Sequence, residues 1–530
     1  MSQTPSVHTD YDKQASPGVV SAVEERFELW RKRAGVLLAP IAFAVVYILC
    51  HGLTPEGRRL SGILAAVGVL WVCETIPLPV TALLGAILSV ILGVGDVKKV
   101  FAYFADPIVF VFIGSFMLAR AMSVHGLDRR IALGFLSIRA IGSSPAGMLG
   151  GLGLVTALLS MWVSNTATTA MMLPIGLGML GALHRVRVER GMEFVPTPDA
   201  RRWPFATAMM LMIAYAASIG GIGTPVGSPP NLIGIGLLQR SLGVQIGFFQ
   251  WMLLCVPMML VMGVALFLLL NLLHRDRPSP TGKVDAADML AFIRAERTRL
   301  GSWTPGQINA AIAFAVAVIL WVLPGILALP WFAGSAMETF FKTRLPESVV
   351  AIVAAVLLFM LPVNLSEGRF TLTWSDATRI DWGTILLFGG GLALGGLMFE
   401  TGVAKAMGES LSARLGVSTL WGLTALSIAM AIVLSEAASN TASATMIVPV
   451  TIAIAQSAGV DPLPPALGAV LGASYGFMLP VSTPPNAIVY GSGLVPIGRM
   501  VRAGLLFDVL GFFLILGGLY VLYPVVFGKA

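Results

Sequence analysis

The chain has 530 residues, of which 56% are hydrophobic and only 12% are charged, and its mean hydropathy is +0.86. A typical soluble domain has roughly 25% charged residues, so this composition excludes a soluble globular protein and predicts an all-α polytopic membrane protein. The formal net charge is +7, but cytoplasmic loops account for most of the basic residues, so no nucleic-acid partner is expected.

The N-terminal segment is polar and contains several basic residues. It lacks the short apolar core and small-residue cleavage site of a signal peptide, so we predict a cytoplasmic tail over 1–34. An extra first helix is expected over 35–59. The cysteines, Cys50, Cys73 and Cys255, lie in or beside apolar segments and do not indicate a disulfide framework.

A transmembrane helix needs about 20 apolar residues, and about eleven segments meet this requirement. They lie near 35–53, 60–78, 79–95, 107–124, 206–240, 247–273, 304–328, 347–364, 382–400, 462–497 and 501–526. Two further apolar segments, 143–182 and 417–456, are too long for one helix and carry a polar Ser-Asn-Thr tripeptide near the middle. We predict that each is a re-entrant hairpin with the tripeptide at its tip.

The distribution of Lys and Arg between loops predicts a multi-pass plasma-membrane protein, in a bacterium the inner membrane, with a cytoplasmic N-terminus. The polar segment 274–303 is then a cytoplasmic linker. It joins a first repeat, 60–273, to a second repeat, 304–527, and each repeat contains one hairpin. The two hairpins enter the membrane from opposite sides in this topology, so we predict inverted repeats, as in many secondary transporters.

The tripeptides at 164–166 and 439–441 are each followed by a Pro-Pro-Asn sequence, at 229–231 and 484–486. Polar residues beside forced helix breaks at membrane depth usually line a solute cavity, because lipid cannot satisfy free backbone groups. A simpler interpretation is that the hydroxyls join neighbouring helices and the prolines only kink them. The occurrence of both motifs twice, on opposite sides of the membrane, favours a binding site.

Hydroxyl and amide oxygens of Ser160, Ser164 and Asn165, with carbonyl oxygens freed by the prolines after Gly227, would suit a hard cation such as sodium. The second repeat offers Ser435, Ala438 and Asn440 with the break at 482–485. A helix is expected to begin after each tripeptide, at Ala167 and Ala442, and its N-terminal amides favour an anion. We expect no arginine near the tripeptides, so sodium and helix ends must offset the anion's charge.

Other residues leave alternatives open. Arg120, the one basic residue in a predicted span, is interpreted as a side chain that snorkels toward a helix end. Glu74 and Glu436 could relay protons, but hydrogen bonding to a hairpin is the favoured role. Residues 472–476 match the Gly-x-Ser-x-Gly pattern of a hydrolase nucleophile at Ser474, yet no histidine follows it in the chain, so we do not predict an enzyme. Hairpins that meet midway also favour a transporter over a channel.

The chain resembles the divalent anion:sodium symporters, the family of bacterial dicarboxylate transporters and mammalian sodium-coupled di- and tricarboxylate carriers. The resemblance covers about residues 35–527. The motifs that carry it are WVCETIP from Trp71, SNTAT from Ser164, GSPPN from Gly227, SE from Ser435, SNTA from Ser439 and PVSTPPNA from Pro480.

This resemblance implies about eleven transmembrane helices with two hairpins, a homodimer in the lipid bilayer, an elevator motion and at least two bound sodium ions. It implies a first sodium site of Ser160, Ser164, Asn165 and Gly227 and a second of Ser435, Ala438, Asn440 and Ser482. The substrate residues would be Ser164, Asn165, Thr166, Ser228, Ser439, Asn440, Thr441, Thr483 and Pro484.

The expected function is therefore sodium-coupled import of a small dicarboxylate such as succinate, malate or fumarate. A citrate or other tricarboxylate carrier and a dicarboxylate exchanger of the same family are the alternatives. The Pro-Pro-Asn motifs favour carboxylates over sulfate, and the implied sodium ligands include none of the basic side chains typical of exchangers. Ser435 and Ala438 replace a threonine and a bulkier residue that family members often have.

Overall fold

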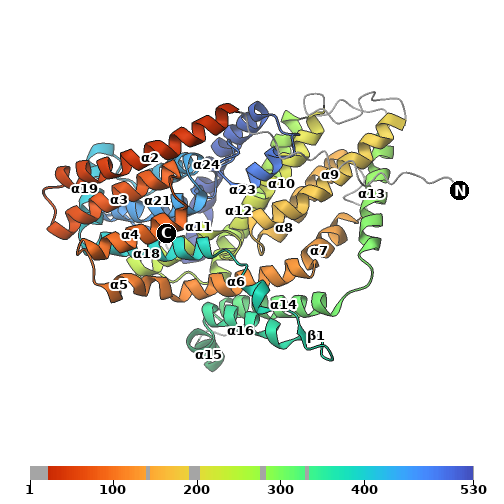
Figure 1. Ribbon diagram of the computed structural model, residues 1–530, viewed down its shortest axis with the longest axis horizontal. Helices are drawn as coiled ribbons and strands as arrows, with labels where there is room; N and C mark the ends of the chain where they lie inside the picture. The colour runs from red at the N-terminus through yellow and green to blue at the C-terminus, as the bar shows by residue number, and fades with distance from the viewer. Residues whose placement is uncertain (1–21, 139–143, 190–202, 275–281, 329–333, 529–530) are drawn as a thin grey trace.

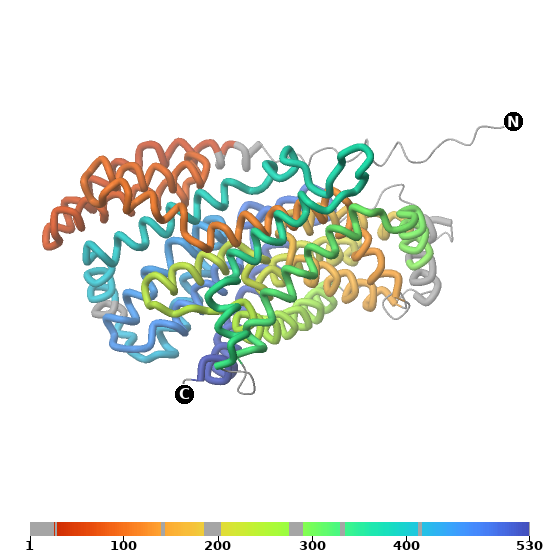
Figure 2. Tube along the Cα trace, turned by 90° about the horizontal axis from the view of Figure 1, so that it is seen from below, coloured from red at the N-terminus to blue at the C-terminus, as the bar shows by residue number. Residues whose placement is uncertain are grey.

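The computed structural model describes residues 22–138, 144–189, 203–274, 282–328 and 334–528. Within these ranges the chain is almost entirely helical, with one short antiparallel hairpin of two strands. The helices form one elongated assembly, in which segments far apart in the sequence lie side by side (Figures 1 and 2). The fold is therefore that of an all-α membrane protein.

The described residues of the first half of the chain form eleven α-helices and one 3-10 turn. These are α2 (Ala22–Leu49), α3 (Pro55–Cys73), α4 (Leu78–Ile91), α5 (Val97–Ala102), η1 (Tyr103–Ala105), α6 (Pro107–Val124), α7 (Leu127–Leu136), α8 (Pro145–Ser160), α9 (Asn165–Glu189), α10 (Pro204–Ile222), α11 (Pro229–Leu242) and α12 (Phe248–Leu273). Helix α2 begins before the predicted span at 35, and most of the predicted N-terminal tail (1–21) lies outside the described residues.

The second half repeats this pattern of long and broken helices. It contains α13 (Gly282–Arg299), α14 (Pro305–Leu327), α15 (Ala336–Arg344), α16 (Glu347–Met360), β1 (Pro362–Asn364), β2 (Arg369–Phe370), α17 (Trp374–Ala377), α18 (Trp382–Glu400), α19 (Val403–Leu415), α20 (Leu420–Ala437), α21 (Asn440–Ser457), α22 (Leu463–Gly472), α23 (Pro484–Tyr490) and α24 (Ile497–Phe527). The segment expected to be a linker thus contains a helix, α13, which packs against α7 and α9.

Local sequence signals account for many of the helix ends. Thr54 caps α3 by accepting a hydrogen bond from the Gly57 amide, and Thr304 with Gln307 forms a capping box at the start of α14. Gly243 follows α11 in the left-handed conformation, with φ of 68°, which costs little without a Cβ atom. These signals divide the apolar sequence into separate helices.

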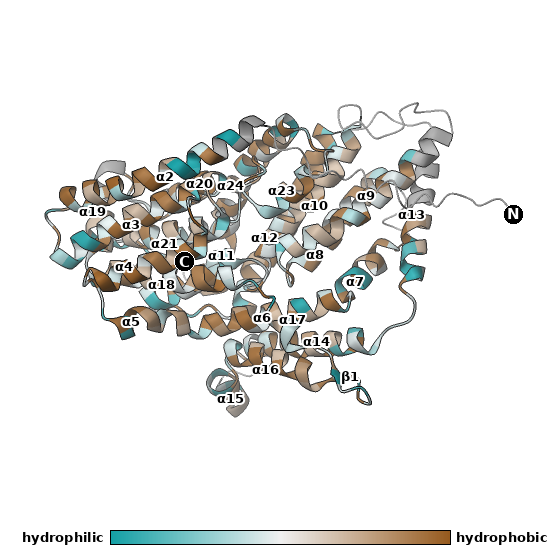
Figure 3. Cartoon of the chain, viewed as in Figure 1, coloured by the Kyte–Doolittle hydropathy of each residue, from teal (hydrophilic) through white to brown (hydrophobic). Residues whose placement is uncertain are grey.

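Nine helices among the described residues are long and apolar enough to cross a membrane, or ten if the bent pair of α15 and α16 is one span. Two of the nine, α9 and α20, are arms of the predicted hairpins. The segments 206–240 and 462–497, each expected as one span, are broken into α10 with α11 and α22 with α23. Most residues of the long helices are apolar, whereas α7 and α13 contain several polar residues (Figure 3).

The helix pairing repeats between the two halves. Helix α8 packs on α10 as α20 packs on α22, and α6 packs on α16 as α18 packs on α4. Every residue of α22, and every residue of α10 after Pro204, is buried, so these two helices lie at the centre of the assembly. The short helices α11 and α23 each pack against a helix of the other half of the chain, α11 on α21 and α23 on α9. Contacts between the two halves of the chain therefore bring together the two tripeptides and the segments before α11 and α23.

Candidate functional site

Each tripeptide lies where one helix ends and the next begins. Helix α8 ends at Ser160 and α9 begins at Asn165, while α20 ends at Ala437 and α21 begins at Asn440. The arms of each pair pack against one another. The helices thus begin at the asparagines, two residues before the expected Ala167 and Ala442.

The serine of each tripeptide caps the helix that follows it. The Ala167 amide donates a 3.3 Å hydrogen bond to Ser164 Oγ, and the Ala442 amide donates a 3.2 Å bond to Ser439 Oγ. Such caps satisfy one of the free amides at a helix start and leave others available to a ligand. An anion at this position would also be favoured by the helix dipole.

A second serine orients each asparagine. Ser160 Oγ donates to Asn165 Oδ1 over 2.8 Å, and Ser435 Oγ lies 2.7 Å from Asn440 Oδ1. Both serines are fully buried. The hydroxyl and amide oxygens that we expected in the sodium sites are therefore paired in the same way in both repeats.

The asparagine of each Pro-Pro-Asn motif holds a helix break in shape. We call residues 223–228 the first break and residues 473–483 the second break. Asn231 Nδ2 donates to the carbonyl oxygens of Gly221 and Thr224, each over 2.8 Å. Asn486 Nδ2 donates to those of Gly476 and Leu479, each over 3.0 Å. We did not predict this role, although the recurrence of asparagine at the end of both motifs was a usable signal.

Carbonyl oxygens surround Gly227 in the first break. A Cβ atom at this position would lie 2.7 Å from Gly221 O, 2.8 Å from Met161 O and 3.0 Å from Ser160 O. Thr224 Oγ1 donates to the same Met161 carbonyl. Neutral oxygens gathered in this way suit a hard cation, and only glycine leaves room among them.

Glu436 supports the second break. Ser482 Oγ donates to Glu436 Oε2 over 2.7 Å, and the Met478 amide donates to Oε1 over 2.8 Å. Glu436, at the end of α20, thus ties its hairpin to the second break, as favoured from the sequence. Glu74 was expected to do the same for a hairpin, but its carboxylate pairs with Arg31 at 3.1 Å.

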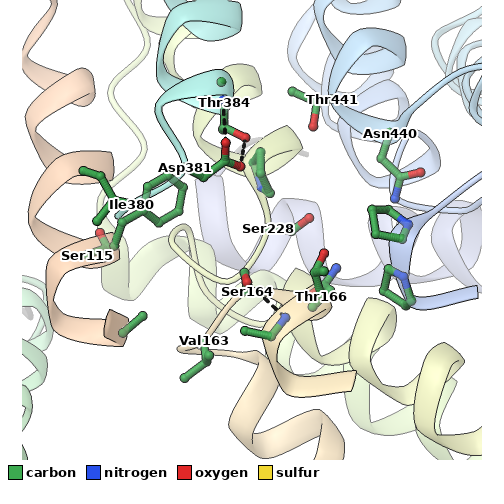
Figure 4. Close-up of a pocket in the computed structure, with 18 of the residues that line it drawn as sticks. Ser115, Val163, Ser164, Thr166, Ser228, Ile380, Asp381, Thr384, Asn440 and Thr441 are labelled. Atoms are coloured by element: carbon green, nitrogen blue, oxygen red, sulfur yellow. Dashed lines mark hydrogen bonds between the residues drawn. The ribbon is translucent and has the colours of Figure 1, made fainter. Parts of the chain in front are cut away.

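A cavity of about 730 Å³ joins the two tripeptides and the two Pro-Pro-Asn motifs (Figure 4). All nine predicted substrate residues line it: Ser164, Asn165, Thr166, Ser228, Ser439, Asn440, Thr441, Thr483 and Pro484. Of the residues proposed only for sodium, Ser482 lines the cavity. The remaining four, Ser160, Gly227, Ser435 and Ala438, are buried outside its lining.

Another part of the cavity lining was not predicted. It consists of Ser115 and Arg120 from α6, Arg379 and Asp381 from the segment before α18, and Thr384 from the first turn of α18. Our expectation that no arginine lies near the tripeptides was therefore wrong, because Arg120 and Arg379 line the same cavity. The reason is that α6 and the 379–384 segment reach the tripeptides only through packing between helices. That Arg120 extends toward a helix end stays a prediction.

The possible hydrolase nucleophile occupies a different environment. Ser474 is buried in the second break, and its Oγ has no hydrogen-bond partner among the described residues. A serine nucleophile needs an adjacent base to accept its proton. The geometry around Ser474 therefore gives no support to the alternative of an intramembrane hydrolase.

Residues 31–527 match the family described as "sodium:sulfate symporter transmembrane region". The chain belongs to this family. The match confirms the resemblance to the divalent anion:sodium symporters. Within the described residues, no group of three or more His, Cys, Asp or Glu side chains could hold a metal ion.

Several curated proteins are similar to this family member over nearly their whole length. The sodium-dependent dicarboxylate transporter SdcS of Staphylococcus saprophyticus is 32% identical over 500 residues, which cover 93% of this chain and 92% of that protein. SdcS of Staphylococcus aureus strain USA300 is 31% identical with the same coverage. The crystal structure of the Alcanivorax borkumensis YdaH transporter has a TM-score of 0.52 and 14% identity, and covers 82% of this chain and 88% of its own. This last likeness concerns the fold alone.

Proposed function

We propose that this protein is a sodium-coupled secondary transporter that imports small dicarboxylates such as succinate, malate or fumarate. The single observation that carries the proposal is the cavity in which both tripeptides and both Pro-Pro-Asn motifs meet. The names of the SdcS relatives support the same cation and the same class of substrate. A site assembled from two repeats is typical of secondary transporters.

Sodium would bind at the tip of each hairpin. The first ion would use Ser160, Ser164, Asn165 and the carbonyl oxygens around Gly227. The second would use Ser435, Ala438, Asn440 and Ser482. The paired bonds from Ser160 to Asn165 and from Ser435 to Asn440 support this assignment, because they hold oxygen atoms together without a compensating charge.

The dicarboxylate would lie between the two tips. Its negative charge would be offset by the bound sodium ions and by the N-terminal amides of α9 and α21. An uncompensated charge in a membrane interior costs several kcal/mol, so the anion needs the cations for tight binding. Sodium would therefore bind first and the anion second.

Transport would require the site to face each side of the membrane in turn. We propose a homodimer in which an elevator motion carries the tripeptides and breaks past the rest of the fold. The predicted topology gives the two repeats opposite orientations, with the N-terminus in the cytoplasm of a bacterial cell. The 369–379 segment is then cytoplasmic, and since Arg379 lines the cavity, this conformation would open inward.

The direct test is uptake of labelled succinate into proteoliposomes that contain the purified protein. We expect accumulation with an inward sodium gradient and none when potassium or choline replaces sodium. Unlabelled malate and fumarate should compete strongly, and sulfate should compete weakly. Sodium-independent accumulation driven by a proton gradient would contradict the proposal.

The same vesicles distinguish the two alternatives within the family. A citrate carrier would be inhibited by citrate more strongly than by succinate. An exchanger would take up labelled succinate only when the vesicles already contain a dicarboxylate. Net uptake into empty vesicles, driven by sodium, is the outcome expected for symport.

A further inference from the structure

Two arginines line the same cavity as the tripeptides. Arg120 is near the end of α6, and Arg379 lies between α17 and α18. Figure 4 shows Ile380 and Asp381, which follow Arg379 in the chain, on one side of the cavity. Ser164 and Asn440 lie on other sides. The two cations thus reach the cavity from elements that carry neither tripeptide.

Both guanidinium groups have unused hydrogen-bond donors. Arg120 Nη2 lies 3.7 Å from Asp376 Oδ1, which is long for an ion pair, and Arg120 Nε is buried without a partner among the described residues. The exposed Arg379 side chain forms no hydrogen bond or ion pair with any described residue. By contrast, Arg240 donates to Asp106 through both Nε and Nη2.

The acidic residue in the cavity lining forms no ion pair with either arginine. Asp381 lines the cavity, but its two carboxylate oxygens already accept hydrogen bonds from the backbone amide and the hydroxyl of Thr384. Two arginines and one carboxylate therefore line the cavity, which leaves a net positive charge among the lining residues. A guanidinium group matches a carboxylate in geometry and can bind it through two parallel hydrogen bonds.

We propose that Arg120 and Arg379 form a carboxylate subsite that holds a second carboxylate of the cargo while the tripeptides hold the first. The proposal rests on the proposed function, because it assumes a carboxylate cargo between the hairpin tips. The subsite selects anions with two or more carboxylates over monocarboxylates, since a single carboxylate cannot reach both walls. The cavity of about 730 Å³ leaves room for such a molecule.

The test is calorimetric titration of succinate into the purified full-length protein at saturating sodium. Arg120→Gln and Arg379→Gln should each raise the Kd for succinate about tenfold, since each removes charged hydrogen bonds to one carboxylate. Arg379→Lys should lose less affinity than Arg379→Gln, because it keeps the charge but not the bidentate geometry. Competition by butyrate, which has one carboxylate, should be the same in all variants.

Two controls separate anion binding from structure. Arg369→Gln removes an exposed arginine that pairs with Glu367 and does not line the cavity, so its Kd for succinate should match the wild type. Asp376→Asn breaks the ion pair of Arg120 but keeps the cation, so it should not weaken succinate binding. Thermal stabilisation by sodium alone should be unchanged in both glutamine variants.

The proposal is overturned if Arg120→Gln and Arg379→Gln bind succinate as tightly as Arg369→Gln does. It is also overturned if both variants lose sodium stabilisation and butyrate competition in proportion to succinate affinity, because this indicates a structural role. Failure of the proposed function looks different. In that case the wild type itself is stabilised by sodium but binds neither succinate nor citrate.

Discussion

Ser160 donates a 2.8 Å hydrogen bond through its hydroxyl to the side-chain oxygen of Asn165, across the tip of the first hairpin. The bond directs the amide oxygen toward the serine and leaves the amide nitrogen free for other partners. One asparagine can then serve a cation through its oxygen and an anion through its N–H groups. In the second repeat, Ser435 Oγ lies 2.7 Å from Asn440 Oδ1 and also 2.8 Å from the carbonyl oxygen of Ala473.

We therefore predict that Asn165→Ala and Asn440→Ala each abolish sodium-driven succinate uptake. Loss of a hydrogen bond to a charged ligand corresponds to at least about a tenfold loss of affinity, and each asparagine would serve two ligands. Uptake is measured in proteoliposomes, and thermal unfolding checks that each variant is folded. Asn364→Ala, at the end of β1 and outside the cavity lining, is the matched control and should transport normally. Retained uptake in either variant would exclude that tripeptide from the site.

A methyl group at Gly227 should damage the first sodium site. Its Cβ atom would lie within 3.0 Å of three carbonyl oxygens, so the break must shift, at a cost of about 1–3 kcal/mol. We expect Gly227→Ala to require a much higher sodium concentration for half-maximal uptake. Gly263→Ala is the control, because a Cβ atom there meets nothing within 4 Å. Identical sodium dependence in the two variants would argue against a cation at Gly227.

Asn231 and Asn486 should act mainly on stability. Replacement of either by alanine removes two hydrogen bonds to carbonyl oxygens in or next to a break, with an expected cost of about 1–3 kcal/mol for the buried groups left unpaired. We expect Asn231→Ala and Asn486→Ala to unfold at a lower temperature than Asn165→Ala, as measured in detergent. Unchanged thermal unfolding would mean that the breaks keep their shape without these bonds.

The proposed elevator motion predicts opposite accessibility of the two tips. Single cysteines placed near Ser164 and Ser439, in a protein that lacks Cys50, Cys73 and Cys255, should react with a membrane-impermeant thiol reagent from opposite sides. Sodium with succinate should change the two reactivities in opposite directions, since ligands shift populations through differential affinity. If both tips react from the same side under every condition, the inverted topology is wrong.

Several features of this protein follow from the order of residues alone. Apolar composition determines the membrane class, because segments of about 20 apolar residues are stable as helices in lipid. The Ser-Asn-Thr and Pro-Pro-Asn motifs determine where helices begin, because proline is tolerated in the first turn of a helix, where its missing N–H is not needed, and serine caps a helix start. For this reason all nine predicted substrate residues were found on one cavity.

Other features depend on contacts between segments that are distant in the sequence. Arg120 and Arg379 line the cavity of the tripeptides only because α6 and the segment before α18 pack around it, and neither sequence neighbourhood contains a signal for that approach. The crossing of α11 onto α21 and of α23 onto α9 is likewise decided by packing. Hydropathy and helix caps act over a few residues, whereas the partners across a cavity are selected by the shape of the whole helix assembly.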